Sequence, residues 1–213
     1  MAAVGLLFVG SVLFVNAIML LGKADPKSVG TFNLFVGALQ VAVPFYLIAT
    51  AKAPDDILLT AGIFLFGFTY LYVGITNLAG HESLGLGWYC LWVVFMAIAF
   101  SLINFVKFGD VKFGIIWLHW AALWALFWLV LAMGRERLTP FTGWVTLVMS
   151  FTTCTFPALL ILLGAWDPLA AGVVIGVTIA EVVLFAAIAP RTTRGTRETF
   201  GGEPRAGGAQ PAT

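Results

Sequence analysis

Charge is scarce in this chain of 213 residues: 10% are Asp, Glu, Lys or Arg, whereas 61% are hydrophobic. This composition, with a mean hydropathy of +1.02, excludes a soluble globular domain and indicates a chain that folds in lipid. The formal net charge is only +1, so the chain also lacks the basic face that nucleic-acid binding requires.

Cysteine and histidine are equally rare, with two of each. Cys90 and Cys154 are isolated thiols inside apolar segments, without metal-ligand spacing, and we interpret them as small buried residues. No Ser/His/Asp or metal-ligand group is present, so we expect no enzyme, metal or cofactor. No lysine lies in the middle of an apolar run, which excludes a retinal Schiff base. Paired intramembrane carboxylates and a ladder of cations are also missing, which argues against a proton pump or voltage sensor.

Long apolar runs are abundant instead. Runs of about 20 residues, the length that crosses ~30 Å of hydrocarbon, recur along the chain. They predict an all-α membrane protein with seven spans: Val4–Gly22, Thr31–Thr50, Ile57–Ala79, Gly87–Val106, Phe113–Met133, Phe141–Ala165 and Leu169–Ala189. A signal peptide begins with a positively charged segment, but no Lys or Arg precedes Lys23 in this chain. We therefore expect the first run to stay in the membrane.

The connections between the runs carry nearly all the charge. Eight of the eleven lysines and arginines fall on one side of the membrane, and Lys52, Lys107 and Lys112 fall on the other. The bias depends on four arginines that follow the last span. The positive-inside rule then predicts an N-terminus outside and a C-terminus in the cytoplasm.

The stretch Ile116–Trp128 holds four tryptophans. On a helix, Trp117, Trp120 and Trp124 form one stripe, and Trp128 extends it by a turn. Trp120 and Trp124 lie near the middle of their span, too far from the membrane surface for an aromatic belt. These side chains therefore either pack a core or line a path.

A second aromatic pair, Phe66 and Tyr70, lies one turn apart in the third span, with Thr69 beside it. If it faces the tryptophan stripe, the two walls form a slit that passes a small, flat, neutral molecule. The same slit blocks hydrated ions, because an apolar constriction strips their water. Tight core packing without a lumen remains the alternative.

A weak internal repeat supports such an arrangement. An offset of 58 residues aligns the first span with the third, for example Leu7 with Leu65 and Phe8 with Phe66. Three hairpins, beginning near Val4, Ile57 and Phe113, would then form a bundle in which the odd-numbered spans are equivalent. Chance similarity between apolar helices is the other explanation.

Polar residues inside the spans have two interpretations. Most, including Asn16, can form hydrogen bonds between neighbouring helices. His119 lies between the tryptophans but points about 100° away from its immediate neighbours, as an interhelical hydrogen-bonding group or as a pore or gating group. Glu181 is the one carboxylate well inside a span, and an intramembrane acid is a functional candidate by default. It lies on the last span, away from the aromatic motifs.

Several segments resemble the AmiS/UreI family of urea and short-chain amide channels. They are VNAI followed by KADPKS (Lys23–Ser28), NLFVG (Asn33–Gly37), LFGFTYLY (Leu65–Tyr72), IIWLHWAALW (Ile115–Trp124) and Thr139–Pro140. The resemblance implies a channel domain of six helices over residues 1–166. Residues 167–190 then form an additional spanning helix, and residues 191–213 a disordered cytoplasmic tail with too few apolar residues to pack.

The resemblance also implies a homohexamer in the bacterial inner membrane, with a channel in each protomer and lipid plugging the central hole. The permeants would be urea or small amides such as acetamide and formamide. By position, the constriction is formed by Phe66, Tyr70, Trp120, Leu123 and Trp124, with Thr69 and Trp117 beside it.

Three departures from the family pattern bear on gating. The acid-gated urea channel of the family has a long second connection and a third rich in histidine and acids, whereas here KAPDD is short and no histidine lies on the predicted outer side. The family's glutamate in the sixth span aligns with Met149. The seventh span is extra, so Glu181 inherits no role.

We therefore predict a passive channel that external acid does not gate. One alternative is a proton-coupled transporter that uses Glu181 and His119. Another is a structural or signalling membrane protein whose aromatic residues serve only for packing.

Overall fold

Seven helices of membrane length account for most of the chain in the computed structural model, which describes residues 1–194. They are Ala2–Leu20 (α1), Pro26–Ala49 (α2), Pro54–Ala79 (α3), Leu84–Ile103 (α4) extended by a π-helix at Asn104–Phe108 (η1), Val111–Leu131 (α5), Thr139–Met149 with Phe156–Leu162 (α6 and α7), and Ala171–Arg194 (α8). A 3₁₀ turn at Glu136–Leu138 (η2) precedes α6, and a π-helix at Ser150–Thr155 (η3) joins α6 to α7. The predicted all-α membrane fold is confirmed, with span ends shifted by a few residues.

The last span ends later than predicted. Helix α8 continues through residues 191–194, which belong to the predicted tail, and the remainder of that tail lies outside the described residues.

Local sequence explains where the spans begin. Asp25 caps α2 through a carboxylate oxygen that accepts from the Ser28 backbone N–H at 3.0 Å, and Pro26 occupies the first turn. Asp110 caps α5 in the same way, accepting from the Phe113 backbone N–H at 3.0 Å. These caps give the first helical N–H groups partners where each helix leaves water.

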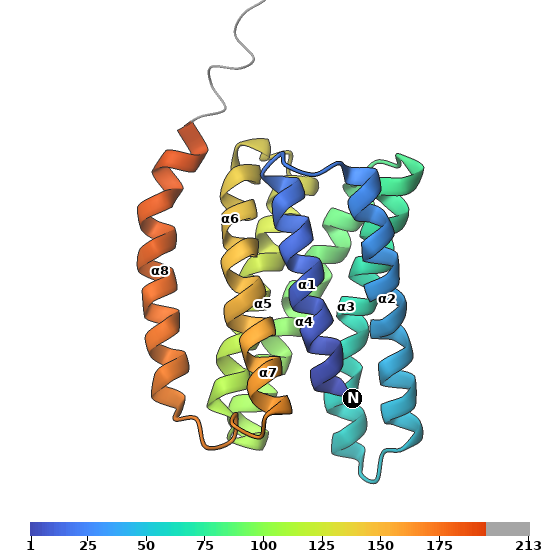
Figure 1. Cartoon of the computed structure of the whole chain (residues 1–213), viewed down its shortest axis with the longest axis vertical. Coiled ribbons are helices and arrows are strands. Elements are labelled where there is room, and N and C mark those ends of the chain that lie inside the picture. Colours follow the sequence, from blue (N-terminus) through green and yellow to red (C-terminus); the bar gives the residue numbers. More distant parts are fainter. Residues whose placement is uncertain (195–213) are drawn as a thin grey trace, which may run out of the picture.

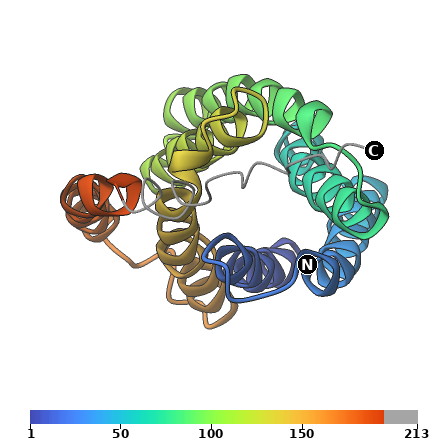
Figure 2. The same ribbon diagram turned by 90° about the horizontal axis from the view of Figure 1, so that it is seen from above.

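The helices α1 to α7 form a ring, and α8 lies outside it beside α5 and α6 (Figures 1 and 2). The most extensive packing joins α2 to α3, α4 to α5, and α1 to the span built from α6, η3 and α7. Contacts within the three predicted hairpins, α1–α2, α3–α4 and α5–α6, are sparser. The tightest pairs therefore join helices of different hairpins rather than the two helices of one hairpin.

Close approach at glycine explains the strongest pair. A Cβ on Gly37 of α2 would lie 2.7 Å from the Leu71 backbone nitrogen, and one on Gly74 of α3 would lie 2.6 Å from a Leu34 methyl group. Lipid tails are as apolar as leucine, so helices in a membrane associate through close packing and hydrogen bonds. The position of these glycines selects α2–α3 over α1–α2.

The sixth span is interrupted for a local reason. Pro157 has no N–H for the regular helical bond to the carbonyl of Thr153, and the chain forms the π-helix η3 just before it. Hydroxyl groups replace part of the lost bonding: Thr155 donates to the carbonyl of Ser150 at 2.8 Å. The irregular turn lies against α1 and beside the centre of α5, where the aromatic residues meet.

Candidate functional site

An aromatic cluster closes the interior of the ring. Phe66 of α3 packs against Trp120 and Trp124 of α5, with ring centroids 4.8 Å apart in both pairs. Trp117 packs edge-on against Trp120, also at 4.8 Å, and Tyr70 lies 6.4 Å from Phe66. All five side chains are buried. The two aromatic motifs, some 50 residues apart in the sequence, thus face each other as the slit hypothesis requires.

Neighbouring residues fix the orientation of the tryptophan rings. The indole N–H of Trp120 donates to the Thr153 hydroxyl in η3 at 3.1 Å, and that hydroxyl donates to the carbonyl of Met149 at 2.7 Å. Phe100 of α4 stacks on Trp117 at 4.8 Å and 19°. Gly62 of α3 leaves room for the same ring, because a Cβ there would lie 2.8 Å from it.

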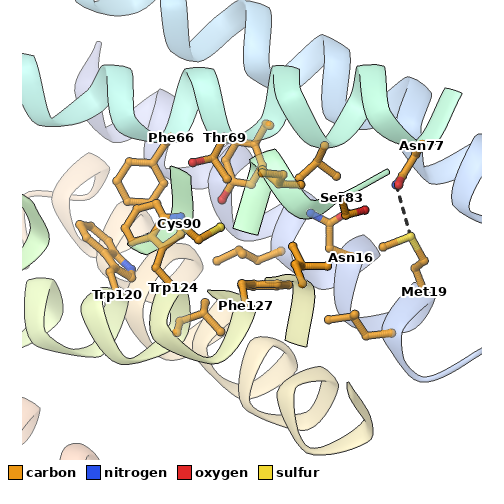
Figure 3. A pocket seen from close by; sticks show the side chains of 17 residues that line it. Asn16, Met19, Phe66, Thr69, Asn77, Ser83, Cys90, Trp120, Trp124 and Phe127 are labelled. Atoms are coloured by element: carbon orange, nitrogen blue, oxygen red, sulfur yellow. Dashed lines mark hydrogen bonds between the residues drawn. The ribbon is translucent and has the colours of Figure 1, made fainter. Parts of the chain in front are cut away.

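Two cavities adjoin this cluster, one on each side. The first, of about 90 Å³, extends toward the end of the bundle where α1 meets α2 and α3 meets α4; Figure 3 shows its lining, with Asn16, Asn77 and Ser83 beyond the aromatic rings. The second, of about 340 Å³, extends toward the N-terminus and includes Ala2 and Gln40. Phe66 and Trp120 line both cavities. They form the partition between two spaces that approach each other from opposite ends of the ring.

Apolar side chains make up most of the first cavity, with a few amides and hydroxyls. Asn16 exchanges two hydrogen bonds with Asn33, at 3.0 and 2.7 Å, which couples α1 to α2 behind the cavity wall. The Thr69 hydroxyl donates to the carbonyl of Leu65 at 2.6 Å, within its own helix. Such a lining offers apolar faces with few groups that hold a solute tightly.

The structure places most of the predicted pathway residues together. The first cavity is lined by Asn16, Phe66, Thr69, Tyr70, Trp120, Leu123 and Trp124. Trp117 lines the second cavity instead. Each of the odd-numbered helices α1, α3 and α5 contributes to the lining, as the repeat predicted, although Phe8 is 41% exposed and its repeat partner Phe66 only 6%.

Trp128 does not continue the stripe. Phe127 and Leu131 line the first cavity below Trp124, and Trp128 does not. A stripe at positions 120, 124, 127 and 131 follows the helical repeat more closely than one that steps by four each time, because four residues overshoot a 3.6-residue turn. The helical spacing in the sequence favours Phe127 and Leu131, and the prediction of Trp128 was wrong because it followed the residue type instead of the spacing.

His119, Met149 and Glu181 lie outside the two cavities, at the junction of α5, α6 and α8. His119 Nε2 is 2.9 Å from Glu181 Oε2, and all three residues line a separate apolar space between α8 and the ring. Our expectation that Glu181 lies away from the aromatic motifs is therefore wrong in part: it contacts a residue next to Trp120. Its carboxylate nevertheless does not reach the aromatic cluster's cavities.

Other residues of the site were missed. Cys90 of α4, interpreted only as a small buried residue, lines the first cavity with Leu13 and Val73. Thr153 and Phe100 hold tryptophan rings from helices that showed no aromatic motif. No spacing rule points to such residues, because they approach α5 from other parts of the chain.

Comparison with known proteins identifies relatives along most of the chain. The model of a protein family described as "AmiS/UreI family transporter" matches residues 1–165. A putative transporter protein AmiS2 of Rhodococcus erythropolis is 54% identical over 165 residues, covering 77% of this chain and 80% of the relative. A putative amidate substrates transporter protein of Mycolicibacterium smegmatis is 41% identical over 187 residues, covering 86% and 88%.

Solved structures agree. The structure of the Helicobacter pylori urea channel in a closed state matches with a TM-score of 0.71 at 31% identity, covering 78% of this chain and all of that one. A crystal structure of the urea channel of the same organism gives a TM-score of 0.70 at 30% identity. The multi-pass helical architecture, the match over residues 1–165 and these relatives lead to one conclusion: the chain is a membrane transport protein, not an enzyme, and belongs to the AmiS/UreI family.

Proposed function

We propose that the chain is a passive channel for urea or short-chain aliphatic amides, with one pathway inside each protomer. A single observation carries the proposal: Phe66 and Trp120 line two cavities that lead to opposite ends of the ring. A small displacement of these two rings joins the cavities into a continuous path.

The chemistry of the partition favours small neutral solutes. The rings of Phe66, Trp120 and Trp124 present apolar faces along which a flat amide can slide. These faces bind the amide only weakly, so it can leave the constriction readily. A hydrated ion loses its water there and finds no charged partner, so its passage costs many kcal/mol. The first cavity has a volume of about 90 Å³, which is several times the ~10–15 Å³ that a cavity needs to hold one water molecule. It therefore has room for a solute as small as urea.

The relatives support this substrate class, since one is named as an acid-activated urea channel and another as a putative transporter of amidate substrates. We extend the proposal to a homohexamer with a lipid-filled central hole in the bacterial inner membrane. The N-terminus then lies outside and α8 ends in the cytoplasm, which agrees with the distribution of Lys and Arg.

Absence of acid gating is part of the proposal. Histidine is the side chain whose unperturbed pKa lies between pH 5 and 8. Within the described residues, neither cavity beside the aromatic cluster is lined by a histidine. His81 lies in the exposed connection between α3 and α4, on the proposed cytoplasmic side, and His119 faces α8.

Proton-coupled transport is the second candidate, and the buried contact between His119 and Glu181 at 2.9 Å favours it. Such a mechanism requires the pair to exchange protons with both sides of the membrane in step with the solute. The pair lies outside the two cavities of the proposed path, which favours the passive channel.

Solute uptake into proteoliposomes tests these functions. A passive channel gives acetamide or urea flux that depends on the solute gradient, does not change with an imposed pH gradient, and stays near-linear to high millimolar concentrations. Accumulation driven by a pH gradient contradicts the channel and supports the coupled transporter. Flux equal to that of protein-free liposomes contradicts both and leaves a purely structural or signalling role.

A further inference from the structure

Helix α8 meets the rest of the protomer through an unusual residue. Between residues 171 and 193, where burial is described, Glu181 is the one buried side chain, with 4% exposure. A Cβ on Gly172 or Gly176 would meet no atom within 4 Å, so the glycines of α8 do not serve close packing. Apolar burial does not drive helices together in lipid. Phe185 of α8 also packs edge-on against Phe141 at 6.3 Å, so the contact of α8 with the ring combines partly exposed apolar side chains with one buried carboxylate.

That carboxylate shares a proton with His119. The Nδ1 atom of His119 is 2.9 Å from the carbonyl oxygen of Ile115, which can only accept, so Nδ1 carries a hydrogen. One further proton then lies between His119 Nε2 and Glu181 Oε2, on one atom or the other, and the pair has no net charge. Neutrality permits the pair to persist at membrane depth.

A second polar contact fixes the start of α8 to the same helix. The Lys112 ammonium group donates to the carbonyl of Trp166 at 2.6 Å and to that of Leu169 at 3.2 Å, in the connection that leads into α8. Lys112 and His119 are seven residues apart on α5 and so share a face. That face is turned about 120° from the mean direction of Trp117, Trp120 and Trp124, at 100° per residue.

The two contacts lie on the side of α5 that faces away from its tightly packed partner α4, beside the sparse contact between α5 and α6. α5 and α6 pack sparsely against each other, and α8 lies against both (Figure 2). The cavity beside Glu181 is also lined by Ile116 and Thr153, and Thr153 accepts the hydrogen bond from the Trp120 indole. A rotation of α5 that separates His119 from Glu181 necessarily turns the tryptophan face as well, because a helix turns as a rigid unit.

We propose that Glu181 is a positioning residue for the aromatic constriction: through His119 it fixes the rotation of α5, and so the gap between Trp120 and Phe66. Helix α8 thereby influences which solutes pass the constriction, although it does not contact the permeant. This inference rests on the proposed channel function.

The test compares variants of the full chain in proteoliposomes by the ratio of butyramide to acetamide permeability. After the permeability of protein-free liposomes is subtracted, this ratio does not depend on how many protomers assemble, so a partial loss of folded protein alone leaves it unchanged. Glu181→Met and His119→Met each remove the contact and are expected to shift the ratio by about two- to thirtyfold, the range in which coupled positions change a distant site. Glu181→Gln keeps a donor toward His119 Nε2 and is expected to stay within about twofold of the wild type.

A double variant, His119→Met with Glu181→Met, leaves no polar group without a partner. It is expected to assemble even if a single variant does not, since apolar replacement of a buried pair is often neutral or stabilising. Because both residues act through one contact, its ratio is expected to equal that of either single variant. Val183→Ala, at a 64% exposed position on α8, is the matched control.

Three results overturn the inference. They are a wild-type ratio in the double variant, a Glu181→Gln variant that behaves like Glu181→Met, and additive effects of the two single substitutions. A wild-type protein that conducts neither urea nor either amide refutes the proposed function itself, and this outcome is distinguished from the others because it needs no variant.

Discussion

Replacing Trp120 with alanine is the most direct perturbation of the proposed constriction. Trp120 is 4% exposed, packs against Phe66 and Trp117 with centroids 4.8 Å apart, and donates to Thr153 at 3.1 Å. Its indole forms part of the wall between cavities of about 90 and 340 Å³. Removal of the ring joins these cavities unless the surrounding helices collapse into the space.

The two physical outcomes differ in their readout. A widened path admits larger solutes such as butyramide or thiourea and raises their permeability relative to urea, whereas a collapsed path loses urea flux altogether. Deletion of a buried tryptophan costs about 3–5 kcal/mol of stability, so assembly must be verified by size-exclusion chromatography before flux is measured. Trp120→Phe keeps a flat apolar ring but removes part of its volume and the bond to Thr153, which is worth about 0.5–1.5 kcal/mol.

Stopped-flow light scattering of proteoliposomes measures both quantities, with Trp92→Ala as the control because Trp92 is 56% exposed on α4. Trp120→Phe is expected to retain more flux than Trp120→Ala. If Trp120→Ala and Trp124→Ala both assemble and conduct urea and larger amides at the wild-type rate and ratio, the tryptophans only pack and the channel reasoning is refuted.

Three further predictions concern gating, topology and packing. Urea or amide permeability is expected to change by less than about twofold as external pH falls from 7.5 to 5, because no histidine among the described residues lines the cavities beside the cluster; a several-fold activation by acid contradicts this and directs attention to His119 and Glu181. A reporter fused to the C-terminus is expected to be active in the cytoplasm, since seven spans follow an outside N-terminus; activity confined to the periplasm reverses the topology. Gly37→Leu is expected to lower the free energy of unfolding in detergent by about 1–3 kcal/mol, because a Cβ there would lie 2.7 Å from the Leu71 backbone nitrogen. Gly172→Ala has open space around the added Cβ and serves as the control; equal stability of both variants contradicts the close-packed α2–α3 pair.

The amino-acid sequence correctly predicted the membrane class, the seven spans and the two aromatic motifs that meet in the cluster. These features follow from local rules: the length of an apolar run, the positions of Asp25 and Asp110 as caps, and the helical spacing of Phe66, Tyr70, Trp120 and Trp124. Motif resemblance then supplied Leu123, whose side chain shows no chemical signal of its own but lines the same cavity.

Tertiary structure decided which helices pair and which face of each helix meets the cavity. Apolar sequences in lipid carry little information on pairing, because every face is compatible with its surroundings and a few glycines such as Gly37 and Gly74 select the partner. The repeat identified three hairpins but did not indicate that the tightest contacts join helices of different hairpins. For the same reason the sequence did not show which face of α5 meets the cavity, and Trp128 was predicted in the stripe in place of Phe127 and Leu131.

The contact between His119 and Glu181 depends on structure most of all. The two residues are 62 positions apart, and either one alone is equally compatible with a hydrogen bond to any neighbouring helix. Their pairing is set by the connection into α8, anchored at Lys112, which brings the one buried carboxylate of that helix against α5 two turns above the anchor. Local sequence rules do not encode such an approach, since it arises from the path of the chain around a completed ring.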